Sequence, residues 1–309
     1  MATTVLITGG TGMVGMALAP ALLQRGYRLI LLTRSRQTQT LPYATHPAVR
    51  YAYWNPSQAE LDDEVLAQAD HIVHLAGANV ADKRWTAARK KEIADSRVQS
   101  GRLLVDRLKA ITHRPLSFVG ASAIGWYGVD DKDHPTPFTE NDPADATFLG
   151  ETCRQWEEST ESLTALGVRR VILRIGIVLS RKGGALPEFE KPLRFGIAPI
   201  LGSGKQVISW IQLQDLVSMI LFSLEESTLQ GIYNATAPTP VSQYSLMVAL
   251  ARQRNQFFIP VPVPAFFLKV LMGEMSVEVL KSTTVSADKI VQRGFHFQFA
   301  TLDKALPVC

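Results

Sequence analysis

Three glycines near the N-terminus, Gly9, Gly12 and Gly15, have a spacing that indicates phosphate chemistry. They follow the apolar run TVLIT directly and precede a segment with helical periodicity. The first glycine of such a turn permits a tight bend, the second lets a pyrophosphate approach the backbone, and the third lets helix and strand pack closely. Free backbone N–H groups and the helix dipole then hold the anion. The pattern therefore predicts a dinucleotide-binding turn, and the alternative is a glycine turn that binds no ligand.

The residues after the second expected strand indicate which dinucleotide fits. An acid there would accept from a ribose 2′-hydroxyl and favour NAD, but the sequence has Thr33-Arg34-Ser35-Arg36. Arg34, helped by its polar neighbours, can hold a 2′-phosphate through charge-assisted hydrogen bonds. We therefore expect NADP(H) to be preferred, and the alternative is a solvated basic turn.

Strand-like and helix-like segments alternate over the first 180 residues. The expected strands are TVLIT, YRLILLTR, Val49–Trp54, Asp70–Ala76, 116–122 and 168–179, and the helical patterns cover 13–22, 86–110 and 150–166. Crossovers of this kind place strands side by side in parallel. The sequence therefore predicts an α/β fold, a Rossmann-type doubly wound parallel sheet.

Glycine and proline become frequent beyond residue 180, and the alternation weakens. The helix-like segment QDLVSMILFSLEE at 214–226 still carries a stripe suited to packing on the sheet. We therefore expect an NADP-binding domain over 1–178 plus about 206–230. A smaller C-terminal α/β substrate domain is expected over 179–205 and 231–309.

Composition narrows the classes of partner. The 309 residues are 46% hydrophobic and 19% charged, as in an ordinary globular protein, and a net charge of +4 is a weak reason to expect nucleic acid. Two cysteines suit a reducing compartment, and no His, Cys and acid set has metal spacing, so no metal is expected. The longest apolar stretch, 257–272, contains three prolines and a lysine and is shorter than the ~20 residues that span a bilayer. We expect a cytoplasmic protein with a small-molecule substrate, no nucleic acid and no membrane, and leave its oligomeric state open.

Longer segments of the chain carry a family resemblance. The glycine turn, Asp70-x-x-x-His74-Leu75-Ala76-Gly77 and Ser122 after the fifth strand resemble the extended short-chain dehydrogenase/reductase superfamily. More closely, the chain resembles its atypical "epimerase family", YfcH-like group. The segments that carry this closer resemblance span nearly the full length and include HLAGANVADKRW, ASAIGWYG, FLGETCRQWE, RIGIVLSRKGGAL, LGSGKQVISWIQLQDL and GIYNATAPTPV.

The resemblance implies a set of cofactor contacts. The glycine turn would line the pyrophosphate, Arg34 the 2′-phosphate, and the residues after His74 the adenosine, while Ala121 and Ser122 would lie near the nicotinamide ribose. Arg97 stands where many extended members have an Asn that contacts the cofactor. The residues implied to bind NADP are Gly9, Thr11, Gly12, Met13, Val14, Gly15, Arg34, Leu75, Ala76, Gly77, Arg97 and Ala121.

The sequence departs from the superfamily at its usual catalytic pair, Tyr-x-x-x-Lys. Phe148 and Thr152 stand at the corresponding positions, so neither a phenol nor an ammonium is supplied there. We predict that Ser122 orients the substrate and that the proton comes from Tyr127 or from water. The alternative for Tyr127 is a packing role in its loop.

Other side chains that could act on a substrate each have a structural alternative. Cys153 is either near the cleft or a small buried residue, and Glu140 is either an acid near the cleft or a solvated loop carboxylate. Trp210 would stack on a flat ligand. His74, in an apolar strand, is expected to be a satisfied core residue. A basic run around Trp85 either attracts a phosphorylated substrate or forms a solvated helix face, and its members are Lys83, Arg84, Arg89, Lys90 and Lys91.

Two functions follow from these features. The first is an NADP-dependent oxidoreductase or epimerase that acts on an unknown small polar substrate, such as a nucleoside sugar. The second is a non-catalytic module that binds NADP(H) and reports it to a partner. The missing Tyr and Lys favour the second function, whereas Ser122 and a furnished C-terminal domain favour the first.

Overall fold

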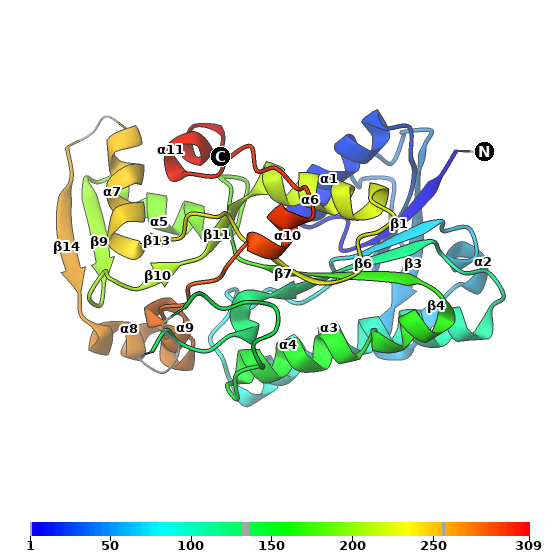
Figure 1. Cartoon of the computed structure of the whole chain (residues 1–309), viewed down its shortest axis with the longest axis horizontal. Coiled ribbons are helices and arrows are strands. Elements are labelled where there is room, and N and C mark those ends of the chain that lie inside the picture. Colours follow the sequence, from blue (N-terminus) through cyan, green and yellow to red (C-terminus); the bar gives the residue numbers. More distant parts are fainter. Residues whose placement is uncertain (1, 132–135, 255–256) are drawn as a thin grey trace.

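The computed structural model describes residues 2–131, 136–254 and 257–309, and an eight-stranded sheet is its centre (Figure 1). The strand order is β12-β7-β6-β5-β1-β2-β3-β4, and all pairs are parallel except β3 with β4. The strands are β1 (Thr4–Thr8), β2 (Arg28–Thr33), β3 (Val49–Asn55), β4 (Glu60–Leu61), β5 (His71–His74), β6 (Ser117–Ala123), β7 (Arg169–Ile175) and β12 (Gly231–Ala235). The order reverses between β1 and β5, and ligands of such sheets bind outside the carboxyl ends at that point. The predicted doubly wound Rossmann-type fold is confirmed.

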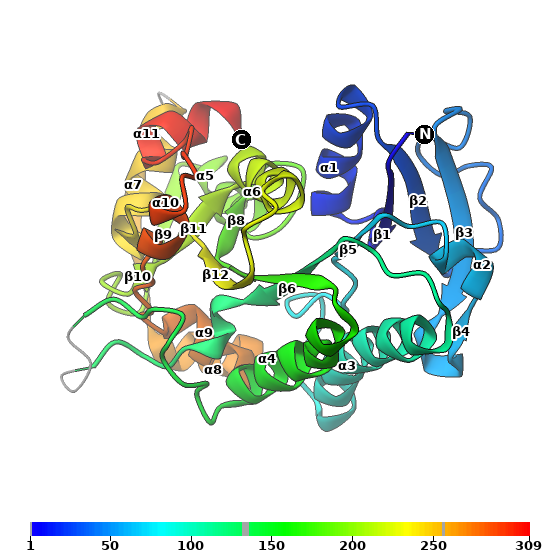
Figure 2. The same cartoon turned by 45° about the vertical axis from the view of Figure 1, so that its right-hand side comes forward.

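Helices cover both faces of the sheet (Figure 2). One face packs against α1 (Met13–Gln24) and α6 (Leu213–Glu225), through a core that includes Leu18, Val119 and Ile220. The other face carries α3 (Ala87–Ala110) and α4 (Phe148–Glu158), with the short α2 (Asp63–Leu66) near its edge. Because successive strand residues point to opposite faces, two buried faces require nearly continuous apolar strands, which explains runs such as TVLIT.

Threonines set where the two long helices of the second face begin. The Thr86 hydroxyl accepts a hydrogen bond from the Arg89 amide at the start of α3, and the Thr147 hydroxyl accepts one from the Gly150 amide at the start of α4. Both residues satisfy amides that the first helical turn leaves without partners. The start of α1 has no side-chain cap.

The rest of the chain forms a second lobe beside the carboxyl ends of the strands (Figure 1). Three two-stranded sheets pair β8 with β11, β9 with β14, and β10 with β13. Their strands are β8 (Ile177–Leu179), β9 (Ile197–Leu201), β10 (Val207–Ile208), β11 (Trp210–Gln212), β13 (Val241–Ser242) and β14 (Ile259–Val263). The helices are α5 (Leu186–Leu193), α7 (Gln243–Gln253), α8 (Ala265–Met272), α9 (Ser276–Leu280) and α11 (Leu302–Ala305). The short α10 (Asp288–Gln292) instead lies against β12, and its Ile290 belongs to the core of the large sheet.

One expected boundary is wrong. Residues from 231 onward were assigned to the smaller domain, but Gly231–Ala235 is β12, the edge strand of the large sheet, paired in parallel with β7. The preceding α6 packs on the sheet as expected and returns the chain beside β7. The large sheet therefore reaches Ala235.

Polar contacts join the second lobe to the segment after β6. Asp130 accepts hydrogen bonds from the Ser282 hydroxyl and from both the amide and the hydroxyl of Thr284. Lys281 donates to the carbonyl of Tyr127, and Lys90 on α3 forms an ion pair with Glu274 at 2.9 Å. These contacts fix the second lobe against the edge of the sheet where a ligand would bind.

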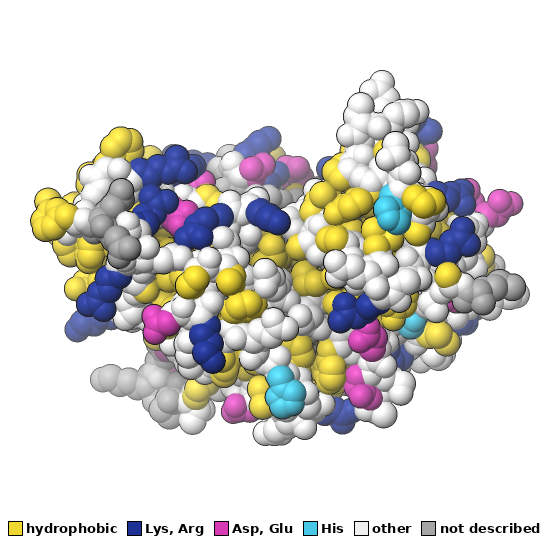
Figure 3. Space-filling model, turned by 90° about the horizontal axis from the view of Figure 1, so that it is seen from above, with side chains coloured by type: hydrophobic (Ala, Val, Ile, Leu, Met, Phe, Trp, Pro, Cys, Tyr) yellow, Lys and Arg dark blue, Asp and Glu magenta, His cyan; other side chains and the backbone are white. Residues whose placement is uncertain are grey.

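The longest apolar stretch of the sequence forms β14 and α8. Its side chains are largely exposed, with Phe257 at 84% and Phe266 at 75%, and hydrophobic side chains gather at the outer, left-hand end of the molecule in Figure 3. In the described ranges, no helix has the length and apolar character needed to cross a bilayer.

We predict that alanine at two glycines of the turn has different effects on the stability of the fold. A Cβ at Gly15 would lie 2.6 Å from both the Gly10 Cα and the Gly9 carbonyl oxygen, whereas a Cβ at Gly12 would meet only the Gly9 oxygen, at 3.3 Å. Gly15→Ala should therefore destabilise the fold by about 1–3 kcal/mol, the usual cost of overpacking, and Gly12→Ala should leave it nearly unchanged. Thermal unfolding of both variants measures this, and equal Tm values would contradict it.

Candidate dinucleotide and substrate site

The glycine turn joins the end of β1 to the start of α1. Gly9 has a φ of +69°, and a Cβ there would lie 2.9 Å from the carbonyl carbon and oxygen of Leu75, so only glycine allows β1 to approach the end of β5 this closely. Thr11 and Gly12 are exposed, and the space around Gly12 is open apart from the Gly9 oxygen. Because α1 lacks a side-chain cap, its first amides and this open space suit a pyrophosphate. The turn therefore fits the cofactor that the sequence implies.

A buried hydrogen-bond network fixes the end of β5 beside this turn. The Thr8 hydroxyl accepts from the amides of Leu75 and Ala76, both at 3.1 Å, and bonds to His74 Nδ1 at 2.8 Å. His74 Nε2 lies 3.2 Å from the Ser100 hydroxyl. Thr8 is then the donor to Nδ1, which places the ring proton on Nε2. Burial lowers the pKa of His74 to about 4, so the ring is neutral. The prediction of a satisfied core histidine is confirmed.

Arg34 and Arg36 have different surroundings after β2. The Arg36 guanidinium lies 3.9 Å from the centre of the Tyr53 ring and 3.9 Å from a Glu60 carboxylate oxygen. Arg34 is exposed, and its side chain makes no hydrogen bond or ion pair with any residue that the structure describes. Its charge still acts on the carboxylate of Glu92, whose pKa is lowered mainly by the hydrogen bond from Arg89 and to a smaller extent by Arg34. Arg34 is therefore the arginine of this turn whose N–H groups have no hydrogen-bond partner in the described chain and can bind a phosphate.

Arg97 places a positive charge beside the end of β5. Its Nη1 donates to the carbonyls of Ala78 and Ile93, and its guanidinium stacks on the Trp156 ring, 4.9 Å from the centre. A Cβ at Gly77 would lie 3.1 Å from Arg97 Cζ. Burial lowers the pKa of Arg97, and no carboxylate pairs with it in the described part of the chain. A bound anion would stabilise this charge.

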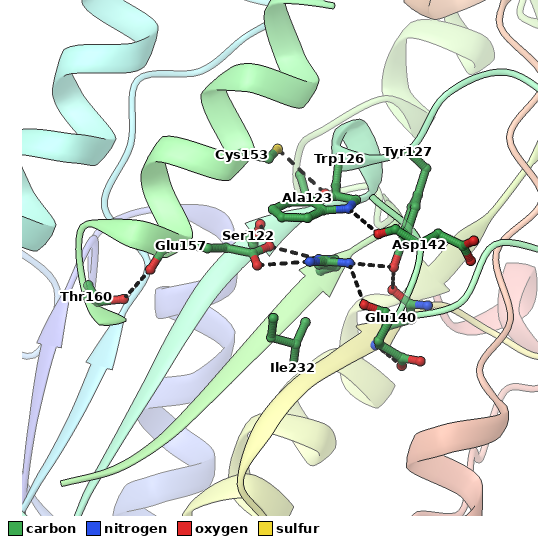
Figure 4. A network of polar contacts seen from close by, with 12 residues as sticks. Ser122, Ala123, Trp126, Tyr127, Glu140, Asp142, Cys153, Glu157, Thr160 and Ile232 are labelled. Atoms are coloured by element: carbon green, nitrogen blue, oxygen red, sulfur yellow. Dashed lines mark hydrogen bonds and ion pairs between the residues drawn. The ribbon is translucent and has the colours of Figure 1, made fainter. Parts of the chain in front are cut away.

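A second polar network lies where β6 and β7 end (Figure 4). The Glu157 carboxylate on α4 forms a bidentate ion pair with Arg174 on β7, with distances of 2.8 Å from Nε and 3.0 Å from Nη2. It also accepts a hydrogen bond from the Ser122 hydroxyl at 2.7 Å. Burial alone would lower the pKa of Arg174, but the hydrogen bonds and charge of Glu157 raise it. Ser122 is therefore held as a donor to Glu157, inside the protein.

Tyr127 belongs to the same network. Its hydroxyl donates to the Asn234 side chain at 2.6 Å and accepts from Arg174 Nη1 at 3.0 Å. The ring is fully buried and stacks on Phe138, with centres 5.3 Å apart, and burial raises the pKa of Tyr127 to about 12. This arrangement agrees with a packing role for the residue, and its role as general acid stays a prediction.

Cys153 and Glu140 are also held inside this region. The Cys153 thiol is buried and donates to the Ala123 carbonyl at 3.6 Å, and burial raises its pKa to about 11, so it is a poor nucleophile. One carboxylate oxygen of Glu140 accepts a hydrogen bond from the backbone amide of Asn234 at 2.7 Å, and the backbone carbonyl of Glu140 accepts one from Arg174. The description of Glu140 as a free, solvated carboxylate is wrong.

Trp210, expected to stack on a ligand, and Trp85, at the centre of the basic run, are both buried. Trp210 is fully buried and donates to the Thr239 carbonyl at 2.9 Å, so its ring cannot stack on a ligand. Trp85 donates to the Val80 carbonyl and meets Phe148 edge to face, with centres 5.1 Å apart. Ala121, expected near the nicotinamide ribose, lies within β6 and is 8% exposed, and its cofactor contact stays a prediction.

Comparisons with known proteins identify the family. Residues 5–236 match the NAD dependent epimerase/dehydratase family, and residues 263–307 match a domain of unknown function, DUF1731. This chain belongs to the NAD dependent epimerase/dehydratase family. It is 36% identical over 305 residues to the epimerase family protein SSP1921 of Staphylococcus saprophyticus, covering 97% of both chains.

Solved structures of similar proteins agree with the fold of this chain. The human epimerase family protein SDR39U1 (isoform 2), solved with NADPH, has a TM-score of 0.84, is 25% identical and covers 98% of both chains. The UDP-glucose 4-epimerase of Thermus thermophilus, solved with NAD, has a TM-score of 0.77 and is 18% identical, covering 99% of this chain and 97% of its own, which shows the fold alone. The resemblance to atypical extended short-chain dehydrogenase/reductases is confirmed, and the chain has the fold of NAD(P)-binding epimerases.

Sequence reasoning did not find Glu157, Arg174 and Asn234 in this epimerase family member. Their partners are far apart in the chain, because Ser122 and Glu157 are separated by 35 residues and Tyr127 and Asn234 by 107. The one available signal was Arg174 itself, an arginine within the apolar run VRRVILRIGIVL. A charge in a buried strand requires a partner, although the sequence does not say which residue it is.

We predict that His74 makes stability depend on pH. The unfolded chain binds a proton near the ordinary pKa of 6.5, whereas the folded ring stays neutral to about 4, so stability is full above 6.5 and is lost as the pH falls toward 4. The difference corresponds to roughly 3 kcal/mol at neutral pH.

His74→Gln removes this titration, and its Tm should fall less between pH 7 and pH 5 than that of the unmodified protein. The pKa of His71 is also lowered by burial, but His71 is present in both proteins and gives the same background. Parallel curves of Tm against pH would contradict the prediction.

Proposed function

We propose that this epimerase family member is an NADP(H)-dependent oxidoreductase or epimerase that acts on a small polar substrate, such as a nucleoside sugar, in the cytoplasm and without nucleic acid. The observation that carries the proposal is the open glycine turn at the uncapped start of α1, with the unpaired Arg34 at the end of the neighbouring β2. The binding of NADPH by the human relative supports the choice of cofactor.

Each part of the proposed site has a separate task. The turn from Gly9 to Gly15 binds the pyrophosphate, Arg34 binds the 2′-phosphate, and Leu75, Ala76 and Gly77 line the adenosine side. The bound nicotinamide supplies hydride transfer. Arg97, whose charge no carboxylate balances in the described chain, stabilises negative charge on the cofactor or on the substrate beside Gly77.

The source of the proton is a separate question. The proton of Ser122 is donated to Glu157, and that of Tyr127 is donated to Asn234. We therefore propose that water supplies the proton and that Ser122 orients the substrate. Tyr127 is the alternative proton donor if its hydrogen bond to Asn234 breaks.

A non-catalytic NADP(H) sensor is the second candidate function. The observation that favours it is that Phe148 and Thr152 replace the usual Tyr and Lys while Tyr127 and Cys153 are buried with raised pKa values. A sensor needs the cofactor site and a second lobe that responds to it, but no proton donor.

The first test concerns cofactor choice. The unmodified protein should bind NADPH more tightly than NADH, and Arg34→Ala should weaken NADPH binding by about 10- to 150-fold, the effect of a charged hydrogen bond, while leaving NADH binding unchanged. Arg36→Ala is the matched control, because Arg36 already contacts Tyr53 and Glu60. Isothermal calorimetry gives the affinities, and equal Kd values for the two dinucleotides in the unmodified protein would refute the preference.

The second test concerns Tyr127. Tyr127→Phe leaves the Asn234 oxygen and one Arg174 N–H without this partner, so it should lower stability by about 1–3 kcal/mol while the NADPH affinity stays the same. Thermal unfolding and calorimetry measure the two quantities. An unchanged Tm would contradict the packing role.

A metabolite screen separates enzyme from sensor. A ligand at 100 times its Kd stabilises a protein by about 2.7 kcal/mol, so a thermal shift screen with NADPH present finds candidate substrates. Substrate-dependent NADPH oxidation then supports the enzyme. If Tyr127→Phe lowers that rate by about 10² to 10⁴, Tyr127 is the general acid.

A further inference from the structure

A glycine turn of the second lobe lies against the cofactor turn. Gly183 and Gly184 follow β8, and a Cβ at Gly183 would lie 3.4 Å from the Sδ of Met13, while one at Gly184 would lie 3.5 Å from its Cε. Met13 is the first residue of α1, directly after Gly12. The two turns therefore lie close together at the start of α1, where the first helical amides have no side-chain cap, although they are about 170 residues apart in the sequence.

The backbone conformation of this turn favours glycine, whereas the distances from the two Cβ positions to Met13 are those of ordinary van der Waals contact. Gly184 has a φ of +76°, which favours glycine, and a Cβ there would also be 3.4 Å from the Val178 carbonyl oxygen. Met13 is partly buried, whereas Thr11 and Gly12 are exposed. The second lobe thus covers one side of the cofactor turn and leaves the phosphate-facing side open.

Two basic residues precede these glycines, and their surroundings differ. Arg181 donates to Glu190, to Gln253 and to two carbonyl groups near the end of the chain, which anchors the base of the turn. Lys182 is exposed, and its ammonium group has no partner among the residues that the structure describes. Only its amide is bonded, to the Ser180 hydroxyl at 3.1 Å. A free cation therefore stands next to the glycine that contacts Met13.

We propose that Lys182 is a second phosphate-binding residue of the cofactor site and contacts the pyrophosphate from the second lobe. This inference rests on the proposed function, since it takes the glycine turn of 9–15 as the pyrophosphate site. A lysine is a point charge that suits a diphosphate, and the long flexible stem of Lys182 lets the ammonium group reach past the two glycines. The glycine turn and α1 supply neutral donors, and Lys182 supplies the charge that they lack.

The test uses three nucleotides that separate the parts of the cofactor. NADPH and 2′-phospho-ADP-ribose contain the pyrophosphate, whereas 2′,5′-ADP contains the 2′-phosphate and a single 5′-phosphate. Lys182→Ala should weaken binding of the first two by about tenfold and leave 2′,5′-ADP nearly unchanged, while Lys182→Arg should restore most of the affinity. Calorimetry at two salt concentrations should also show a smaller salt dependence for Lys182→Ala.

Lys205→Ala is the matched control. Lys205 is also exposed, also has a free ammonium group in the described structure, and also bonds its amide to a serine hydroxyl two residues earlier, that of Ser203 at 3.2 Å. Its turn contacts Ile200 and Tyr244, far in sequence from Met13. We expect it to bind all three nucleotides like the unmodified protein.

The outcomes distinguish this inference from the proposed function. If the unmodified protein binds no NADPH, the proposed function fails and this inference fails with it. If the unmodified protein binds NADPH and Lys182→Ala binds it equally well, only the role of Lys182 is overturned. An equal loss of affinity for 2′,5′-ADP also overturns it, because Lys182 would then act on every anion at this surface. If Lys182→Ala lost affinity for a nucleoside diphosphate sugar but bound NADPH normally, Lys182 would belong to the substrate site, and the proposed contact with the cofactor would be overturned.

Discussion

The ion pair between Arg174 and Glu157 is the interaction on which the carboxyl edge of the sheet depends. Their side chains are 1% and 6% exposed, and either charge alone at this depth would cost several kcal/mol. Because Glu157 also accepts from Ser122, and Arg174 also donates to Tyr127 and to the Glu140 carbonyl, one pair connects α4, β6, β7 and the segment after β6. The position of each candidate catalytic group follows from this pair.

The same network limits the chemistry. A hydroxyl that already donates to a buried carboxylate or amide oxygen transfers its proton to a substrate only if that hydrogen bond breaks. Breaking it is costly at a buried site, because no water is at hand to replace the lost partner. Ser122 and Tyr127 both stand in this position, while the helix of Phe148 and Thr152 offers no replacement. The interactions that stabilise this edge thus occupy the hydroxyl protons of Ser122 and Tyr127, the two groups that the sequence predicts to act, so turnover requires either water or a local opening of the network.

The fold could be predicted from sequence because its signals are local, whereas the site is made of contacts between distant residues. Apolar runs, helical periodicity and the glycine pattern predict the sheet, the turn after β1 and the place of His74 in the core. The strand GIYNA falls in the part of the chain where strands and helices no longer alternate regularly and glycine and proline are frequent, so the sequence places it in the smaller domain. Only its pairing with β7 shows that it belongs to the large sheet. Trp210 has a residue type suited to stacking on a ligand, but sequence pattern does not reveal burial by segments far along the chain. The partners of Arg174 were hidden for the same reason.

In the proposed cofactor site at the ends of β1, β2 and β5, the backbone provides the shape and side chains provide the charge. Shape comes from positions where a Cβ would collide, as at Gly9 against Leu75, and from the Thr8 hydroxyl that fixes the end of β5. In the proposed site, charge comes from Arg34 and Lys182, which are exposed and whose side chains form no hydrogen bond or ion pair with other residues of the described chain. Because the charged groups carry no packing, they can be replaced without loss of the fold, and the preference between dinucleotides can change while the turn stays the same. Gly9 and Gly15 have no such freedom, since a Cβ at Gly9 would collide with the backbone of Leu75 and one at Gly15 with the backbone of Gly9 and Gly10.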